Sequence, residues 1–177
     1  MHVLGLDIST SITGMTLVDD SGKIIYYEAV DTRNPNKFDD LFDKVSFIKD
    51  RLLHLSKEYK VDEIFIEQSL QMFRPGMSSA KTLSTLSKCN GMVSWICFAI
   101  FKTKPQYIAA TSARKLNNIK VPQGSKAKDI VMKHLLDNEP AFTVEYTAKG
   151  NPKPKYFDIA DSIIIARAGQ VKCSIKK

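Results

Sequence analysis

The sequence predicts an α/β fold, with a mixed five-stranded sheet flanked by helices. Three short apolar segments near the start of the chain are joined by tight turns, which is typical of an antiparallel meander. Further along, two short apolar segments alternate with long stretches of helical apolar spacing, which predicts two strands parallel to the first. By this interpretation residues 1–177 form a single domain, because a chain of this length leaves little room for a second core.

The first part of the chain is expected to hold three strands, a helix and a fourth strand. The three strands are expected at residues 2–7, 14–19 and 23–30, with the turn Asp19-Asp20-Ser21-Gly22 between the last two. From Phe38 to about Tyr59 apolar residues recur every three or four positions, which predicts a helix. Residues 61–67 predict a fourth strand, whose apolar residues on both faces are typical of a buried central strand.

The second part is expected to be mostly helical. A loop at 71–79 precedes a long helix at 79–101, and a short fifth strand follows at 106–109. Residues 111–117 predict one or two helical turns, and residues 123–137 and 156–170 predict two further helices. The segment 138–155 is expected to be irregular, with a flexible basic loop at 149–155.

Charge and cysteine usage limit the class of protein. A net charge of +7 and a pI of about 9.3 favour an anionic partner, nucleic acid above all, although a solvated basic surface also explains them. Cys89, Cys97 and Cys173 form no metal-ligand spacing with the histidines, which is typical of reduced thiols in a cytosolic protein. The sequence shows no signal-peptide pattern, and its longest apolar stretch, 92–101, is too short to span a bilayer. We therefore expect a cytoplasmic protein with no membrane partner.

Two of the predicted apolar strands each end in a carboxylate residue. Asp7 follows Val3-Leu4-Gly5-Leu6, and Glu67 follows Ile64-Phe65-Ile66. Ligands collect beyond the carboxyl ends of parallel strands, and a buried carboxylate needs a cation, a donor or a proton. Asp158 and Asp161 form a second acidic pair on one face of the last helix, which also carries the apolar residues that pack on the sheet. All of these carboxylates are expected to form one acidic pocket in a basic protein.

Such a pocket suits phosphodiester hydrolysis. Two magnesium ions roughly 4 Å apart provide an activated water and stabilise the leaving oxygen, and carboxylates are their natural ligands. Each acid taken alone has a structural explanation: Asp7 as the cap of the following turn, Glu67 paired to a lysine, Asp158 at a helix N-terminus and Asp161 in solvent. Their joint occurrence where one site can gather them favours the metal site.

Three motifs resemble a known family. Gly5-Leu6-Asp7-Ile8-Ser9, followed by Gly14, resembles the first strand and hairpin of the RNase H-like superfamily. Ile66-Glu67-Gln68 resembles the second acidic motif of the RuvC-type Holliday junction resolvases. Asp158-Ile159-Ala160-Asp161-Ser162 resembles their D-x-A-D-A motif, with Ser162 in place of the last alanine. The motifs occur in the family's order over nearly the whole chain.

The resemblance implies a fold, an activity and partners. The fold would be RNase H-like, and Asp7, Glu67, Asp158 and Asp161 would be the catalytic, metal-binding carboxylates. The protein would be a homodimer with two magnesium ions in each active site, which manganese can replace. It would be a crossover junction endodeoxyribonuclease that nicks symmetric strands of a four-way junction and leaves 5′-phosphate and 3′-hydroxyl ends, in a bacterial cell or, as a phage or viral member, in an infected host.

The sequence departs from the family in two further places. The aromatic wedge that often follows the Glu-Gln pair is Leu70 here, and the nearest aromatic residue is Phe73. Phe73 either stacks on a base step at the junction or packs beneath its own loop, and the sequence favours neither. The segment 138–155 is longer than the usual connection into the last helix, so activity on a broader range of branched DNA is also compatible with the sequence.

Basic residues around the acidic pocket are predicted to hold the DNA backbone. Lys126 and Lys128 open a helix after Gly124-Ser125, and they resemble the basic segment that contacts the backbone near the site in relatives. Part of the helix 79–101 is expected to form the dimer face. The predicted DNA contacts are Leu70, Phe73, Arg74, Lys81, Arg114, Lys115, Lys126, Lys128, Lys149, Lys153 and Lys155.

Other functions remain open at this point. One is a different RNase H-like nuclease, which cuts RNA in hybrids or is of the YqgF type. Another is a module that binds branched DNA without cutting it, against which the intact carboxylates argue. A third is an actin-like sugar kinase or ATPase, because Asp7-Ile8-Ser9-Thr10-Ser11 also resembles a phosphate loop. That fold needs two such domains, and this chain is too short for them.

Overall fold

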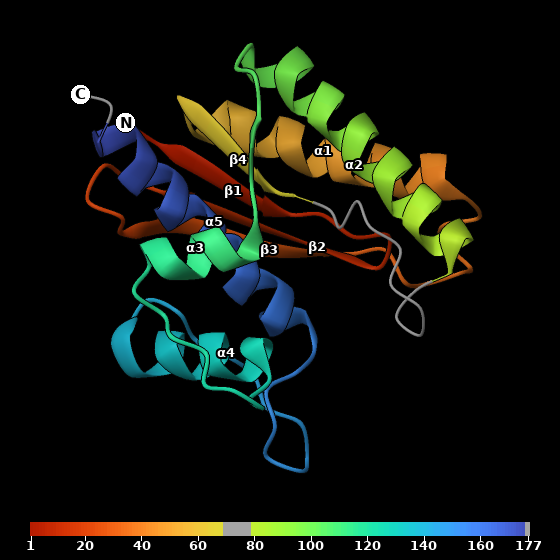
Figure 1. The fold of residues 1–177 in the computed structure, drawn as a ribbon. Helices are drawn as coiled ribbons and strands as arrows, with labels where there is room; N and C mark the ends of the chain where they lie inside the picture. Colours follow the sequence, from red (N-terminus) through yellow and green to blue (C-terminus); the bar gives the residue numbers. More distant parts are fainter. Residues whose placement is uncertain (69–78, 176–177) are drawn as a thin grey trace.

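The computed structural model describes residues 1–68 and 79–175. It contains a five-stranded sheet in the order β3-β2-β1-β4-β5, in which β1 and β3 are antiparallel to β2. β4 is parallel to β1, and β5 is parallel to β4, so the predicted mixed sheet is confirmed (Figure 1). The elements are β1 Val3–Asp7, β2 Ile12–Val18, β3 Ile24–Asp31, α1 Leu41–Glu58, β4 Glu63–Glu67, α2 Ala80–Phe101, β5 Gln106–Ile108, α3 Ala110–Leu116, α4 Ala127–Asn138 and α5 Lys155–Ile175.

Helices cover both faces of the sheet. The side chains of β1 alternate between two buried clusters: Val3 joins the cluster under α3, α4 and α5, whereas Leu4 and Leu6 join the cluster under α1 and α2. All three are fully buried, because the central strand has an apolar layer on each side. Figure 1 shows this arrangement, with α1 and α2 on one side of the sheet and α5 on the other. In the part of the chain that the structure describes, no helix combines the length and apolarity needed to cross a membrane.

Helix α1 begins later than predicted, because a side chain caps it. Asp40 has an extended backbone, and its carboxylate accepts hydrogen bonds from the backbone N–H groups of Phe42 and Asp43 at 2.7 and 3.0 Å. Phe38 therefore lies before the helix. It is still buried, because its ring packs against Phe47 with 5.4 Å between ring centroids.

Other predicted boundaries shift for similar local reasons. Gly124 has a φ of +80°, in the left-handed region, so a helix cannot continue through it, and α4 begins at residue 127 rather than 123. Strand β2 begins at Ile12 rather than at residue 14, because Ile12 pairs with Asp31 of β3. The predicted turns at 111–117 form a complete helix, α3, which adds one helix to the expected order.

Two glycines set how closely α5 approaches the sheet. A Cβ atom at Gly5 would overlap the backbone of Ser162 and Ala166, and a Cβ atom at Gly14 would overlap the carbonyl group of Asp158. Backbone atoms cannot be displaced as a flexible side chain can, so both positions require glycine. Between them, the hydroxyl of Ser162 forms a buried hydrogen bond of 2.7 Å with the hydroxyl of Thr16 in β2. The start of α5 is thereby held directly on β1 and β2.

We predict that Gly14→Ala destabilises the protein, because the new methyl group collides with the backbone of α5. Overpacking of this kind costs about 1–3 kcal/mol or more, which lowers the melting temperature by roughly 2–4 °C per kcal/mol for a chain of this size. Thermal unfolding followed by circular dichroism measures the change. Gly91→Ala is the control, because Gly91 lies in a helix with open space around it, and alanine there should stabilise by up to about 1 kcal/mol. A Gly14→Ala protein as stable as the wild type would contradict the close contact.

Candidate functional site

The carboxyl ends of four strands lie at one edge of the sheet. β1, β4 and β5 run parallel, and β3 runs the same way because both it and β1 are antiparallel to β2. Asp7 is the last residue of β1, and Glu67 is the last residue of β4. Gly14, the partner of Asp7 in the sheet, contacts the backbone of Asp158 at the start of α5. Two strands and one helix therefore bring Asp7, Glu67, Asp158 and Asp161 to this edge, and we refer to these residues as the acidic cluster.

Asp7 lies where its charged form is unfavourable. Burial raises its pKa well above the usual value, and the negative charges of Glu67 and Asp161 raise it further. Lys128 opposes this shift, and Asp158 adds a smaller upward contribution. The mutual effects show that the members of the acidic cluster lie within electrostatic reach of one another.

The pKa of Glu67 is raised in the same way as that of Asp7. Burial and then the charge of Asp161 raise its pKa to about 7, although the cations Lys128 and Arg114 act in the opposite direction. Its own carbonyl group accepts a hydrogen bond of 3.4 Å from the side-chain amide of Asn90 in α2. A carboxyl group with a pKa of about 7 holds a proton or takes a cation near neutral pH.

Lys128 of α4 reaches into the acidic cluster. Its Nζ atom lies 3.6 Å from Oδ1 of Asp158 and 3.4 Å from Oδ2 of Asp161. Those two aspartate side chains are only 19% and 13% exposed, and burial raises the pKa of both despite the lysine. Lys128 therefore offsets only part of the unfavourable burial of these two carboxylates.

The geometry argues against the structural explanations for Asp7 and Asp161. The turn after Asp7 is capped by Ser9, whose hydroxyl accepts hydrogen bonds from the backbone N–H groups of Ile12 and Ser11 at 3.0 and 3.2 Å. Asp161 is buried rather than solvated. Asp158 does lie in the first turn of α5, where a negative charge also complements the helix dipole.

The donor set of the acidic cluster fits a divalent metal ion. It offers hard carboxylate oxygens in a region that disfavours their uncompensated charge, which is the environment that magnesium or manganese ions occupy in proteins. As the side chains stand, however, no three histidine, cysteine or acidic side chains within residues 1–68 and 79–175 lie close enough together to hold an ion. Metal binding by this cluster therefore stays a prediction.

Two further predicted basic residues lie beside the acidic cluster. Arg114 of α3 lowers the pKa of both Glu67 and Asp161, so its charge is close to them. Arg114 and Lys115 also line a pocket of about 460 Å³ next to α3. Lys126 occupies the N-cap position of α4, immediately before the turn that carries Lys128.

The other predicted DNA contacts are spread more widely. Lys81 is exposed in the first turn of α2. Lys153 and Lys155 form ion pairs with Glu145, so the segment 149–155, which was expected to be a flexible loop, makes defined polar contacts. Leu70, Phe73 and Arg74 lie outside the described residues.

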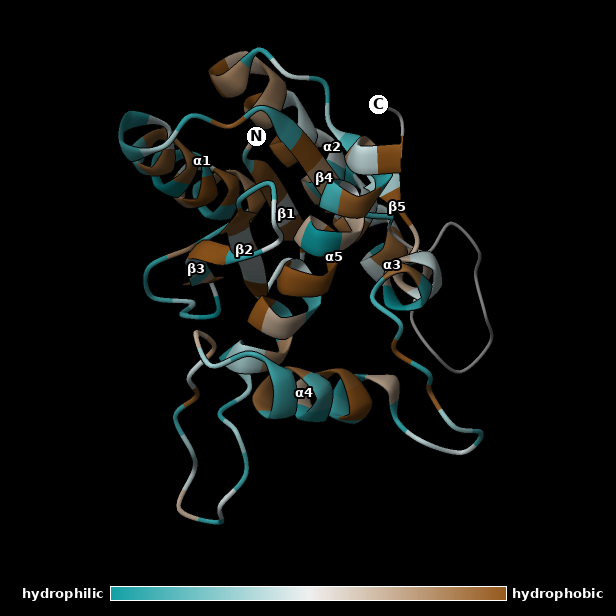
Figure 2. Ribbon diagram, turned by 90° about the vertical axis from the view of Figure 1, so that its left-hand side faces the viewer, coloured by the Kyte–Doolittle hydropathy of each residue, from teal (hydrophilic) through white to brown (hydrophobic). Residues whose placement is uncertain are grey.

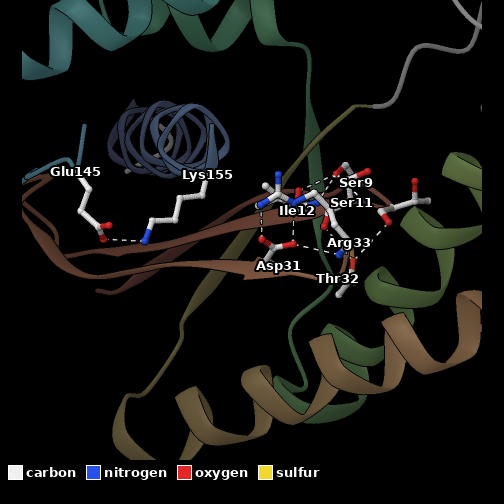
Figure 3. A network of polar contacts seen from close by, with 9 residues as sticks. Ser9, Ser11, Ile12, Asp31, Thr32, Arg33, Glu145 and Lys155 are labelled. Carbon is white, nitrogen blue, oxygen red and sulfur yellow. Dashed lines mark hydrogen bonds and ion pairs between the residues drawn. The ribbon is translucent and has the colours of Figure 1, made fainter. Parts of the chain in front are cut away.

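Arg33 is a cation near the acidic cluster that the sequence reasoning missed. It follows β3, and its guanidinium group donates two hydrogen bonds to Asp31, from Nε at 2.9 Å and from a terminal nitrogen at 2.5 Å (Figure 3). The hydrogen bonds to Asp31 are the main cause of the raised pKa of Arg33, and the charge of Asp158 raises it further. The predicted meander already indicated the position of Arg33, because the third strand of a meander ends at the same edge of the sheet as the first. The polar residues after β3 therefore belong to this edge.

Comparisons with known proteins identify the fold. No protein-family model matches the sequence, and no curated protein sequence is significantly similar to it. Solved structures do match: T. thermophilus RuvC in complex with a Holliday junction substrate has a TM-score of 0.68 at 17% identity, over 99% of this chain and 96% of that one. A second Thermus thermophilus RuvC structure has a TM-score of 0.67 at 18% identity, over 99% and 97%. The yeast mitochondrial Holliday junction resolvase Ydc2 has 0.62 at 17%, over 98% and 80%. The predicted RNase H-like fold of the RuvC type is thus confirmed.

The raised pKa of Glu67 predicts that the protein in EDTA loses stability as the pH rises. The folded-state pKa of about 7 exceeds the ordinary value of 4.5, so the folded state binds this proton more tightly than the unfolded state does. The resulting stabilisation is complete below pH 4.5 and is lost as the pH passes 7. Melting temperatures measured at pH 5.5 and pH 8 should differ by about a few degrees.

Two further measurements separate this effect from general pH sensitivity. Glu67→Gln removes the titrating group and should reduce the difference between the two pH values. Magnesium should raise the melting temperature of the wild type more at pH 8 than at pH 5.5, because metal ligands must be deprotonated. An identical pH dependence in Glu67→Gln would contradict the assignment of the titration to Glu67.

Proposed function

We propose that this chain is a metal-dependent, structure-selective endodeoxyribonuclease that resolves four-way and other branched DNA junctions by paired nicking. The observation that carries the proposal is the acidic cluster at the carboxyl edge of a sheet with the RuvC fold. The whole chain, residues 1–177, would act as a single nuclease domain. A neighbour of the same fold was solved with a Holliday junction substrate, which supports the choice of DNA substrate.

The acidic cluster would hold two magnesium ions, which manganese can replace. When bound, such ions provide an activated water for attack on phosphorus and stabilise the leaving oxygen. Asp7 and Glu67 present their oxygens from central strands that are buried on both faces, and Asp158 and Asp161 present theirs from a helix fixed on the sheet. Ligands on such rigid elements keep their geometry better than ligands on loops.

The basic residues at the edge of the cluster would bind the substrate. Lys128 and Arg114 already interact with the carboxylates, so a phosphodiester entering the site meets positive charge on the side of α3 and α4. Lys126 and Lys115 extend this basic surface along the same two helices. Their charges would attract the DNA backbone without reading its sequence.

Paired nicking implies two active sites. A four-way junction offers two symmetric strands, so we propose a homodimer in which each copy cuts one of them. The exposed side of α2 is a candidate for the dimer face. The protein would act in the cytoplasm of a bacterial or phage-infected cell.

A nicking assay on a synthetic four-way junction tests the proposal. With magnesium or manganese, the wild type should cut the junction faster than a linear duplex, a flap or an RNA/DNA hybrid. Asp7→Asn and Glu67→Gln should still bind the junction but cut it at least about 100-fold more slowly, because each removes a charged metal ligand. Asp62→Asn is the control, since Asp62 bonds to Lys60 and His2 near the start of β4, at the opposite edge of the sheet.

The outcomes separate the competing functions. Preferred cutting of the hybrid would indicate a different RNase H-like nuclease. Tight junction binding by the wild type without any cutting would indicate a binding module. Full activity of Asp7→Asn or Glu67→Gln would remove that residue from the site.

A further inference from the structure

The segment between α4 and α5 contains a small ordered hairpin. An antiparallel bridge pairs Tyr146 with Pro152, and the backbone N–H of Thr147 donates a hydrogen bond of 2.8 Å to the carbonyl of Asn151. Gly150 forms the turn, with a φ of +77° and an N–H that donates to the carbonyl of Thr147 at 2.9 Å. Figures 1 and 2 both show this segment projecting beyond α4, away from the sheet. We refer to residues 143–154 as the arm.

Charged hydrogen bonds hold the base of the arm. The carboxylate of Glu145 accepts from Nζ of Lys153 at 2.5 Å, from Nζ of Lys155 at 2.8 Å and from the hydroxyl of Tyr156 at 2.9 Å. These donors lower the pKa of Glu145 to about 2, so the carboxylate stays charged at any working pH. Because Lys155 and Tyr156 belong to the first turn of α5, the arm is attached to the helix that carries Asp158.

An aromatic contact supports the other side of the base. Phe142 is buried, and its ring lies 5.8 Å from the ring of Tyr27 in β3 and 6.3 Å from the ring of Tyr156. The hydroxyls of Tyr27 and Thr143 lie 3.3 Å apart. The arm is therefore fixed to both β3 and α5, so binding through it would cost little conformational entropy.

The base of the arm lies beside the edge that carries the acidic cluster. Lys155 and Asp158 both lie in the first turn of α5. The hydrogen bond from Arg33 is the main cause of the lowered pKa of Asp31, and the charge of Lys155 lowers it further. Figure 3 shows the Lys155–Glu145 pair in the same view as the Asp31–Arg33 pair. The base of the arm is therefore attached beside the end of α5 that carries the acidic cluster.

The exposed part of the arm offers positive charge and an aromatic ring. Residues 143–155 contain three lysines and one acidic residue, Glu145, which Lys153 and Lys155 already engage. Lys149 lies next to Gly150 at the turn and is exposed to solvent, with no ion pair among the described residues. Tyr146 is 53% exposed although it lies in the ordered part of the hairpin. An exposed lysine and an exposed aromatic ring on a fixed projection suit a nucleic-acid backbone.

We propose that the arm contacts the branched DNA beside the cleaved strand. Its binding surface there is the adjoining double-helical branch of the junction. Lys149 contacts a backbone phosphate, and Tyr146 packs against the neighbouring sugar or base. Lys153 and Lys155 have a different role from the one their sequence suggested: they hold the shape of the arm through Glu145. This inference rests on the proposed function, because it assigns part of the same DNA substrate to a surface away from the acidic cluster.

Binding measurements in an Asp7→Asn background test the arm without cleavage. One lost phosphate contact lowers the slope of log affinity against log salt by about 0.9. Lys149→Ala should therefore bind a four-way junction more weakly by up to about 8-fold at 0.1 M salt, with the difference vanishing toward 1 M. Tyr146→Ala should weaken binding several-fold and leave the salt slope unchanged, because the contact that it removes is not ionic.

Lys57→Ala is the charge-matched control. Lys57 is an exposed lysine in the last turn of α1, at the opposite edge of the sheet from the acidic cluster, and its loss changes the net charge by the same amount. It should leave the affinity within about twofold and the slope unchanged. Melting temperatures check that each variant is folded.

The test separates failure of the arm from failure of the proposed function. If the wild type nicks the junction and Lys149→Ala matches Lys57→Ala in affinity and salt slope, Lys149 does not contact the DNA backbone. If Tyr146→Ala also binds like the wild type, no part of the arm is involved. If the wild type neither prefers nor cuts the junction, the proposed function itself is wrong.

Discussion

The position of the candidate site depends on how closely α5 lies on β1 and β2. Most helices pack on a sheet through side chains, which keep the two backbones about 10 Å apart. Here Gly5 and Gly14 remove the side chains of the sheet, and the backbone of α5 enters the space they leave. Asp158 and Asp161 therefore reach the ends of the strands with short side chains. Without this contact, the carboxylates of the helix would stand away from those of the strands, and the acidic cluster would not form.

The acidic cluster opposes the overall charge of the protein. A chain with a net charge of +7 places four carboxylates where burial raises their pKa values, and repulsion by neighbouring carboxylates adds to the shift at Asp7, Glu67 and Asp158. Lys128 offsets part of this charge, although its own side chain is 58% exposed. The arrangement is unfavourable for the folded state taken alone, which is common for sites that bind cations or perform acid–base chemistry. The basic surface around the cluster gives the same site an attraction for a polyanion.

The sequence predicted the fold well because its periods were clear. The five strands and the long helices follow from apolar spacing, and the order of Asp7, Glu67, Asp158 and Asp161 along the chain sufficed to expect one acidic edge. Helix starts were missed where a single residue decides them, such as the side-chain cap at Asp40 and the left-handed Gly124. Arg33 was missed because its relation to Asp158 depends on three-dimensional proximity. The hairpin at 143–154 was missed because the contacts at its base, with Glu145 and with distant aromatic rings, join residues that lie far apart in the sequence.

The hydrogen bond between the hydroxyls of Thr16 in β2 and Ser162 in α5 constrains the order in which these two residues can be substituted. Within the described residues, the buried hydroxyl of Thr16 bonds only to Ser162, whereas the hydroxyl of Ser162 also donates to the carbonyl of Ile159 at 2.7 Å. If Ser162 is replaced first, the buried hydroxyl of Thr16 loses its hydrogen-bond partner, which destabilises the folded state by about 1–3 kcal/mol. Losing Thr16 first leaves Ser162 bonded. An evolutionary path from this chain to the alanine found in the D-x-A-D-A motif is therefore ordered, with the change in β2 preceding the change in α5.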